Sequence, residues 1–251
     1  METTTSSNVT VAELVANDYR TAEIFKKHGI DFCCGGKKTI EKVCEEKNID
    51  STKLFDEIFA LQNQPKDEQH NFNNWGLAFL ADYIVNVHHT YINNSVNLIT
   101  EFAQKVARVH GDHNPETRDI AKLWDDVVAE LTVHMKKEEL LLFPYIKNLE
   151  RYVKGDLENL PQTHFGTVKN PIRMMEHEHD LAGTLMKTIA ELSNNFTPPA
   201  HACNTYRVLY AKLNEFQNDL HQHIHLENNI LFPKAILLEE STTDANNSCV
   251  I

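Results

Sequence analysis

Glycine is scarce in this sequence, at 8 of 251 residues. Glycine provides many of the tight turns that connect short strands, and stretches of alternating β-branched residues are also rare, which argues against a β-rich fold. No apolar stretch is long enough to cross a bilayer. Positive charge is scarce as well, because the formal net charge is −12. This excess of negative charge argues against nucleic acid or an anionic membrane as the main partner.

Targeting signals and paired cysteines are lacking too. The N-terminus, METTTSSNVTVAEL, has neither a basic start nor a clean apolar run, both of which a secretory signal would show. The five cysteines are odd in number and have no framework spacing, a pattern typical of a reducing compartment. These features predict a soluble, cytoplasmic protein.

Helical periodicity dominates what is present. Four long segments repeat apolar residues every three or four positions, namely residues 74–108, 114–148, 170–193 and 197–238. Residues 1–62 contain shorter apolar helices and predict a small helical domain, followed by a polar linker over residues 63–73. The last residues, 241–251, are expected to be disordered. The sequence therefore predicts an all-α fold with an antiparallel four-helix bundle over residues 74–240.

Histidine is unusually frequent, with 14 residues. Helical spacing places one histidine of each long segment on its apolar face, and in two segments a glutamate follows four positions later. This inward set is His88, His134, Glu138, His179, His223 and Glu227. The same spacing predicts that His89, His177, His221 and His225 face water. The order "His, then His-x-x-x-Glu" thus occurs twice, and both His-x-x-x-Glu steps lead to Phe-Pro.

The inward set predicts a site for two metal ions. A buried glutamate is costly unless it is paired or bound to a cation. Two carboxylates from facing helices can bridge two metals about 3.5–4 Å apart, and the four imidazoles can then bind two per metal. Nitrogen and oxygen ligands without thiolate suit non-haem iron, with manganese as a second choice. Octahedral iron would keep positions for an oxo or hydroxo bridge and a small exogenous ligand.

This ligand pattern resembles a hemerythrin-like di-iron bundle. Ordinary hemerythrins carry a further histidine where this chain has Gly183, which argues against simple oxygen carriage. The chain is more similar to the iron–sulfur cluster repair di-iron family (repair of iron centres, RIC). The similarity extends over nearly the whole chain and is carried by the segments HGIDFCCGGKKTI, RVHGD, HMKKEELLLFP, EHDLAG, TPPAHAC and HIHLENNILFP.

The resemblance implies a cytoplasmic stress-response protein that restores iron–sulfur proteins after damage by nitric oxide or oxidative stress. It implies that the inward set, His88, His134, Glu138, His179, His223 and Glu227, binds two iron ions. Glu130 and Glu178 match inward acidic positions of the family, and Glu130 lies one turn before His134. The implied partners are damaged iron–sulfur proteins and small ligands such as nitric oxide or oxygen. The resemblance is also compatible with a homodimer.

Cys33 and Cys34 match the family's Cys-Cys-Gly-Gly motif. Adjacent cysteines rarely form a disulfide, because the ring is strained. The neighbouring Lys37 and Lys38 would favour thiolate, so the pair could relay iron or a nitrosyl group. His110 lies about 33 Å from His88 along a continuous helix. It is therefore expected at the end of the bundle, away from the metals.

Three functions remain open at this point. The protein could supply iron to damaged clusters, with the cysteine pair as a relay. It could instead be a di-iron enzyme that reduces nitric oxide, or peroxide or oxygen. A third hypothesis is an oxygen or nitric oxide sensor. All three need the same metal ligands, so the sequence does not separate them, and the electron donor also stays open.

Overall fold

The computed structural model describes residues 9–64, 71–160 and 163–248, and every regular element in these ranges is helical. The prediction of an all-α fold is therefore confirmed. The chain divides into two compact units. One contains residues up to Gly76 together with the short stretch 224–234, and the other contains residues 77–223 and 235–251. None of the described helices combines the length and apolar character needed to cross a membrane.

The N-terminal unit contains the helices α1 (Val11–Asn17), α2 (Thr21–Lys27), α3 (Ile40–Lys47) and α4 (Ser51–Gln62). A capping box begins α1, because Thr10 Oγ1 accepts from the Glu13 amide while Glu13 Oε2 accepts from the Thr10 amide. The side chains of Val11, Phe25 and Leu54 are fully buried in its core. These short helices place the Cys33–Cys34 loop between α2 and α3.

The predicted linker over residues 63–73 is only partly described, because residues 65–70 lie outside the described ranges. Its end is ordered. Phe72–Asn74 form a 3-10 helix, η2, whose Phe72 side chain is buried against Trp75 with their ring centroids 4.8 Å apart. The compact N-terminal unit thus continues past residue 62, to Gly76.

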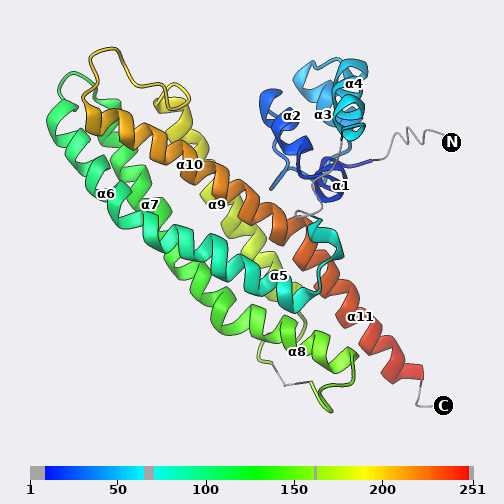
Figure 1. Cartoon of the computed structure of the whole chain (residues 1–251). Coiled ribbons are helices and arrows are strands. Elements are labelled where there is room, and N and C mark those ends of the chain that lie inside the picture. The colour runs from blue at the N-terminus through cyan, green and yellow to red at the C-terminus, as the bar shows by residue number, and fades with distance from the viewer. Residues whose placement is uncertain (1–8, 65–70, 161–162, 249–251) are drawn as a thin grey trace. The chain divides into compact units, whose positions relative to one another are not determined.

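Four long helical stretches make up the rest of the chain (Figure 1). They are α5 (Leu77–Ile84) with α6 (Thr90–His110), α7 (Glu116–Lys137) with α8 (Phe143–Val153), α9 (Lys169–Leu192), and α10 (Asn204–Leu226) with α11 (Phe232–Ser248). The four long segments expected from periodicity are therefore present. The tail expected to be disordered is helical through Ser248, and residues 249–251 lie outside the described ranges.

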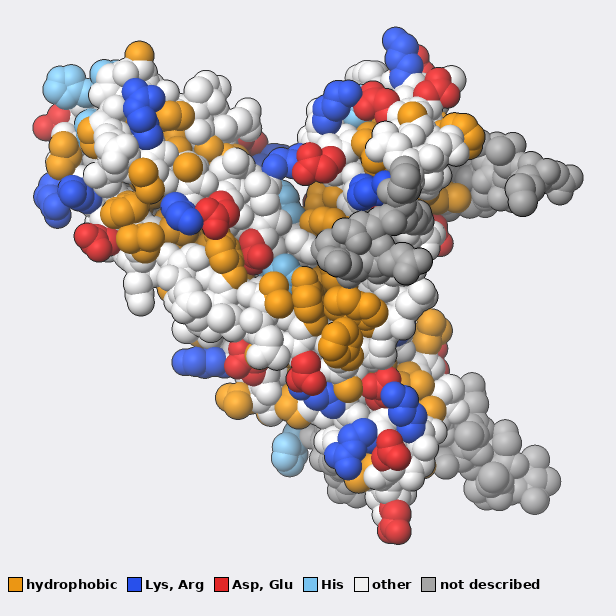
Figure 2. All heavy atoms as spheres, in the orientation of Figure 1, with side chains coloured by type: hydrophobic (Ala, Val, Ile, Leu, Met, Phe, Trp, Pro, Cys, Tyr) orange, Lys and Arg blue, Asp and Glu red, His pale blue; other side chains and the backbone are white. Residues whose placement is uncertain are grey.

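The bundle core follows from the apolar stripes of these helices. α7 packs against both α6 and α9, and Trp124 of α7 is fully buried against Phe216 of α10 with ring centroids 4.7 Å apart. The Trp124 indole N–H donates to Thr100 Oγ1 of α6 at 2.9 Å. On the face shown in Figure 2, acidic and basic side chains are interspersed among neutral and apolar ones.

Three of the long stretches contain one π-helical turn in the described chain: η3 (Val85–His89), η4 (Glu138–Leu142) and η5 (Glu227–Leu231). Phe143 and Phe232 donate their amides to the carbonyls five residues earlier, at Glu138 and Glu227. The prolines that follow lack an N–H, so they cannot complete the ordinary i to i−4 ladder. The repeated Phe-Pro therefore follows a widened turn, after which the helix continues as α8 and α11.

Candidate metal centre

Two sets of buried side chains meet inside the bundle. One set is His89, Glu138, His223 and Glu227, and the other is His134, Glu138, His179 and Glu227. Within each set the candidate ligand atoms lie within 4.8 Å of one another, and every one of these residues is at most 2% exposed. Glu138 and Glu227 belong to both sets, which is the arrangement required of carboxylates that bridge two metals.

The histidines within each set are paired by their Nε2 atoms. His89 and His223 approach to 3.2 Å, and His134 and His179 approach to 3.0 Å. Oε2 of Glu138 lies 3.4 Å from His89 Nε2 and 3.3 Å from His134 Nε2. Imidazole lone pairs and carboxylate oxygens gathered at this depth need cations between them. The donor set therefore fits a di-metal site.

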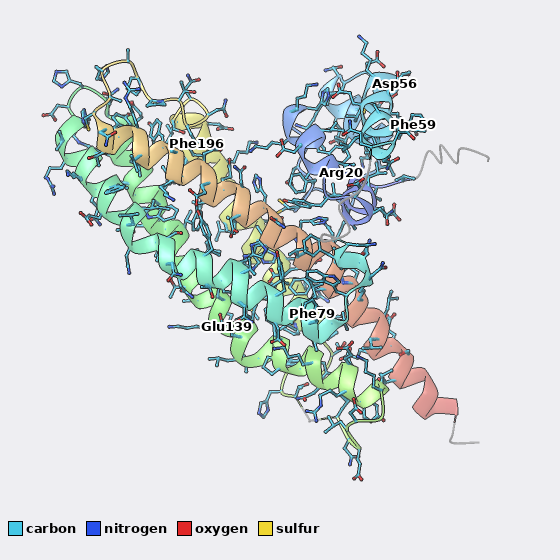
Figure 3. All side chains as sticks on the ribbon, viewed as in Figure 1. Arg20, Asp56, Phe59, Phe79, Glu139 and Phe196 are labelled. Atoms are coloured by element: carbon cyan, nitrogen blue, oxygen red, sulfur yellow. The ribbon has the colours of Figure 1, made fainter. Side chains whose placement is uncertain are left out.

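A carboxylate orients one histidine of each set. His134 Nδ1 donates to Glu178 Oε2 at 2.9 Å, and His89 Nδ1 donates to Glu139 Oε1 at 2.8 Å. Glu139 is labelled in Figure 3. Such partners fix the tautomer that leaves Nε2 available to a metal. The hydrogen bond from His134, together with the ion pair to Lys137, lowers the pKa of Glu178 to about 2. Glu178 therefore stays ionised at neutral pH.

The structure places His89 in one of the two ligand sets, whereas His88 belongs to neither of them. The His88 Nε2 atom is nevertheless buried and makes no hydrogen bond within the described part of the chain. Both rings are 1% exposed, so the expectation that His89 faces water is wrong. The physical reason is η3, because a π-turn places five residues where regular periodicity assumes fewer, and both adjacent histidines of this turn are buried. His88 is held by Asp219, whose Oδ1 lies 3.0 Å from His88 Nδ1. Asp219 was missed from sequence, although it lies one helical turn before His223.

The prediction that His225 faces water is also wrong. Its side chain is fully buried, and its ring packs against Tyr19 and Phe32 of the N-terminal unit. Burial lowers the pKa of His225 to about 3, so the ring is neutral. The helical pattern of its own segment could not reveal that helices far away in the sequence cover this side.

The two acidic residues implied by the family differ in position. Glu178 holds His134 as described above, whereas Glu130 is exposed on α7. The implied inward position of Glu130 is therefore not found. Glu139, which the family resemblance did not single out, is exposed and contacts His89.

Cys33 and Cys34 form a compact cluster with Asp31. Asp31 Oδ1 accepts both cysteine amides at 3.0 Å and lies 3.3 Å from the Cys33 thiol. The two sulfur atoms are 3.9 Å apart. The hydrogen bond with Cys34, followed by burial, raises the pKa of Cys33 well above its usual range. The expected lysine-stabilised thiolate is therefore wrong for Cys33, and Lys38 instead pairs with Glu46 at 2.6 Å.

His110 ends α6, as expected, outside both ligand sets. Its Nε2 lies 3.2 Å from the sulfur of Cys203, which is exposed. The RVHGD and TPPAHAC segments are thus brought together at one end of the bundle. Sequence spacing gave no sign of this pair, because the two residues come from separate long segments.

Two family models match this chain. Residues 80–235 match the hemerythrin HHE cation-binding domain, and residues 7–62 match a domain of unknown function, DUF542. The iron–sulfur cluster repair protein YtfE of Yersinia pseudotuberculosis serotype O:1b (strain IP 31758) is 38% identical over 221 residues, which cover 86% of this chain and 91% of that protein. YtfE of Yersinia pestis (strain Pestoides F) matches with the same identity and coverage.

The chain belongs to the iron–sulfur cluster repair family. Its two units correspond to the two matched domains, apart from the stretch 224–234. The buried histidines and carboxylates are the di-metal site of its hemerythrin-like domain.

Proposed function

We propose that this repair protein binds two iron ions and supplies iron to damaged iron–sulfur proteins. The observation that carries the proposal is the sharing of Glu138 and Glu227 by both ligand sets. Two bridging carboxylates and two imidazoles per metal form a nitrogen and oxygen donor set, which suits iron. Rebuilding a cluster that has lost iron requires an iron source.

The ligand assignment is part of this proposal. His89 and His223 would hold one iron, His134 and His179 would hold the other, and Glu138 and Glu227 would contribute to both. His88, expected from the sequence, is replaced by His89 because only His89 lies within the ligand set. Bound iron supplies redox and Lewis-acid chemistry. The protein's own side chains fix the imidazole tautomers through Glu178 and Glu139 and exclude bulk water.

The cysteine loop supports a relay. Asp31, Cys33 and Cys34 offer three ligand atoms within 4.8 Å of one another. Asn229 Nδ2 donates to the Phe32 carbonyl at 3.0 Å. Asn229 lies two residues after Glu227 in the same π-turn, so the thiol loop is anchored to the turn that supplies a bridging ligand. Movement of Fe²⁺ between oxygen, nitrogen and sulfur ligands needs no change of oxidation state.

The decisive experiment follows iron and product together. The protein is loaded anaerobically with ⁵⁷Fe and mixed with a nitric-oxide-damaged iron–sulfur enzyme in equimolar amount. Iron donation predicts ⁵⁷Fe in the reactivated client and matching loss from the donor. Cys33→Ser and Cys34→Ser should slow transfer at least several-fold while leaving the iron content of the donor unchanged. Cys203→Ser, which removes an exposed thiol of the bundle, is the matched control.

The same reaction tests the alternative enzyme. Reduction of two nitric oxide molecules to nitrous oxide and water consumes two electrons and two protons. Nitrous oxide formed over many turnovers with a supplied reductant, with iron retained and no effect of the cysteine substitutions, would replace iron donation by nitric oxide reduction. Binding of nitric oxide with neither turnover nor iron transfer would indicate a sensor.

A further inference from the structure

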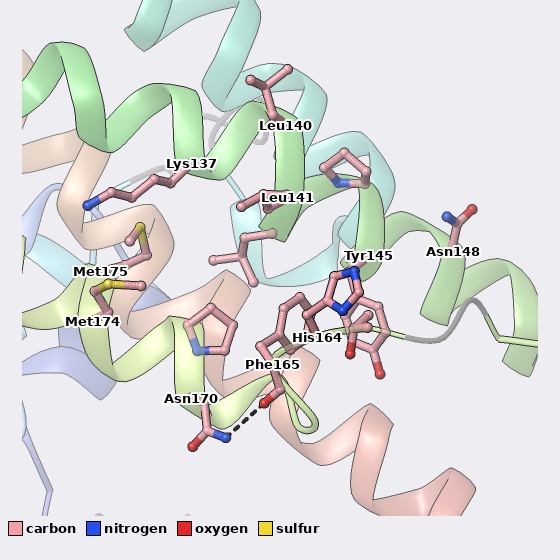
Figure 4. A pocket seen from close by; sticks show the side chains of 14 residues that line it. Lys137, Leu140, Leu141, Tyr145, Asn148, His164, Phe165, Asn170, Met174 and Met175 are labelled. Carbon is pink, nitrogen blue, oxygen red and sulfur yellow. Dashed lines mark hydrogen bonds between the residues drawn. The ribbon is translucent and has the colours of Figure 1, made fainter.

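A large apolar pocket opens beside the metal centre. It has a volume of about 700 Å³ and is formed by residues from the end of α7 through α8, from the start of α9, and from the loop before α9 (Figure 4). Leu141 and Met174 line it and are 61% and 47% exposed, whereas Met175 is 1% exposed. This volume lies in the usual range of small-molecule sites.

The walls are suited to an apolar organic body. Leu141, Met174 and Met175 supply flexible aliphatic and thioether surface, and Tyr145 and Phe165 supply aromatic surface. The Tyr145 and Phe165 rings are perpendicular with centroids 5.1 Å apart. Methionine adapts readily to ligands of irregular shape. Burial of such walls by a ligand would be favoured by the hydrophobic effect.

Lys137 is the one Lys or Arg side chain in the described lining, which includes no carboxylate. This is notable in a chain with a net charge of −12. The Lys137 side chain is one-third exposed, so its ammonium group can donate to a further acceptor. Charge complementarity therefore favours a ligand with one acidic group.

Lys137 also connects the pocket to the metal ligands. Its ammonium group pairs with Glu178 Oε1, while Glu178 Oε2 accepts from the metal-site residue His134 at 2.9 Å. A second connection runs along α9, because the lining residue Met175 lies one helical turn before the metal-site residue His179. An anion bound to Lys137 would compete with Glu178 and leave that carboxylate a stronger acceptor for His134.

We propose that this pocket binds a small organic anion with a large apolar body, that its acidic group contacts Lys137, and that binding is coupled to the metal centre through Glu178. A stronger acceptor at His134 Nδ1 makes this imidazole a better donor to the metal, so the oxidised centre is favoured. Reciprocity then requires the oxidised protein to bind the anion more tightly than the reduced protein. The coupling rests on the proposed iron centre, whereas ligand binding does not.

The binding test uses 8-anilinonaphthalene-1-sulfonate as probe with the full-length, metal-loaded protein. We expect saturable one-to-one binding that decanoate displaces. Met174→Glu and Leu141→Glu each place a carboxylate among the lining side chains at exposed positions, and should weaken probe binding at least tenfold. Leu98→Glu is the matched control, because Leu98 is 42% exposed on α6 and lies outside the pocket lining. If Leu98→Glu weakened probe binding to the same extent, the assignment of the binding site to this pocket would be wrong.

Lys137→Met tests recognition of the acidic group. It should weaken the sulfonate probe several-fold and leave the uncharged analogue N-phenyl-1-naphthylamine unaffected. Coupling is tested by measuring probe affinity in the oxidised and reduced states, where we expect at least threefold tighter binding to the oxidised protein and loss of this difference in Lys137→Met. Equal affinities in the native protein would refute coupling. Because the pocket mutants can also be compared in metal-free protein, failure of the iron proposal would be recognised separately.

Discussion

At the scale of single residues, the main feature of the candidate metal centre is that only two of its six side chains belong to both ligand sets. Glu138 and Glu227 each take part in both ligand sets, whereas each histidine takes part in one. Loss of one carboxylate should therefore affect both metals. Loss of one imidazole should affect mainly one.

Removal of a bridging charge provides the first test. Glu138→Gln and Glu227→Gln should each reduce the metal content from about two ions per chain to one or fewer, because a neutral amide is a poor bridging ligand. Metal analysis by mass spectrometry of purified protein measures this. Glu130→Gln is the control, since Glu130 is exposed on the same helix as His134. Native metal content in both bridging variants would contradict the assignment.

The adjacent histidines provide the second test. His89→Ala should lower metal content to about one ion per chain, whereas His88→Ala should retain two, because His88 pairs with Asp219 outside the ligand sets. The visible absorption spectrum of the oxidised protein reports the same change. If His88→Ala were the variant that loses metal, the ligand at this position would be His88.

At the scale of the helical element, the π-turns decide which side chains reach the metals. η4 and η5 begin at Glu138 and Glu227, the two glutamates shared by both ligand sets, and each is followed by Phe-Pro. Each proline lacks the N–H that a regular helix would donate to the carbonyl four residues earlier. Without that hydrogen bond the backbone can keep the wider turn in which the carbonyl of each glutamate accepts from the phenylalanine five residues later.

Restoring that amide should disturb the site more than the fold. In Pro144→Ala the new N–H can bond the Leu140 carbonyl and favour a regular helix in place of η4. We expect the free energy of unfolding to change by less than about 1 kcal/mol, while metal affinity measured by chelator competition falls several-fold. Pro171→Ala is the control, because Pro171 lies in the first turn of α9, where a missing amide costs little.

At the scale of the whole molecule, His225 joins the N-terminal helices to the stretch 224–234 that is grouped with them. Its pKa is lowered to about 3 by burial, below the ordinary histidine value of about 6.5. Between these two values the unfolded chain binds more protons than the folded chain. Stability from this group is thus present above about pH 6.5 and is lost as the pH falls towards 3.

A pH series of urea unfolding measures this contribution. Native stability should decrease below about pH 6.5, by at most about 1.4 kcal/mol per pH unit from this histidine. His225→Leu should reduce the slope between pH 6.5 and 5, whereas His177→Leu, at an exposed position, should not. Glu178, with its pKa of about 2, acts at lower pH. An unchanged slope in His225→Leu would contradict the assignment.

The sequence by itself determined the all-α fold, the four long helices, and five of the six residues that meet at the metal centre. It did so because apolar spacing and the His-x-x-x-Glu steps are local properties of a helix. Tertiary structure alone decided the rest. The π-turn η3 buried His89 beside His88 and brought it into a ligand set, and packing of distant helices buried His225 and joined His110 to Cys203. Reasoning from periodicity assumes that a helix is regular and that one of its sides stays exposed to solvent. The first assumption fails where a turn widens, and the second fails where another part of the chain covers the helix.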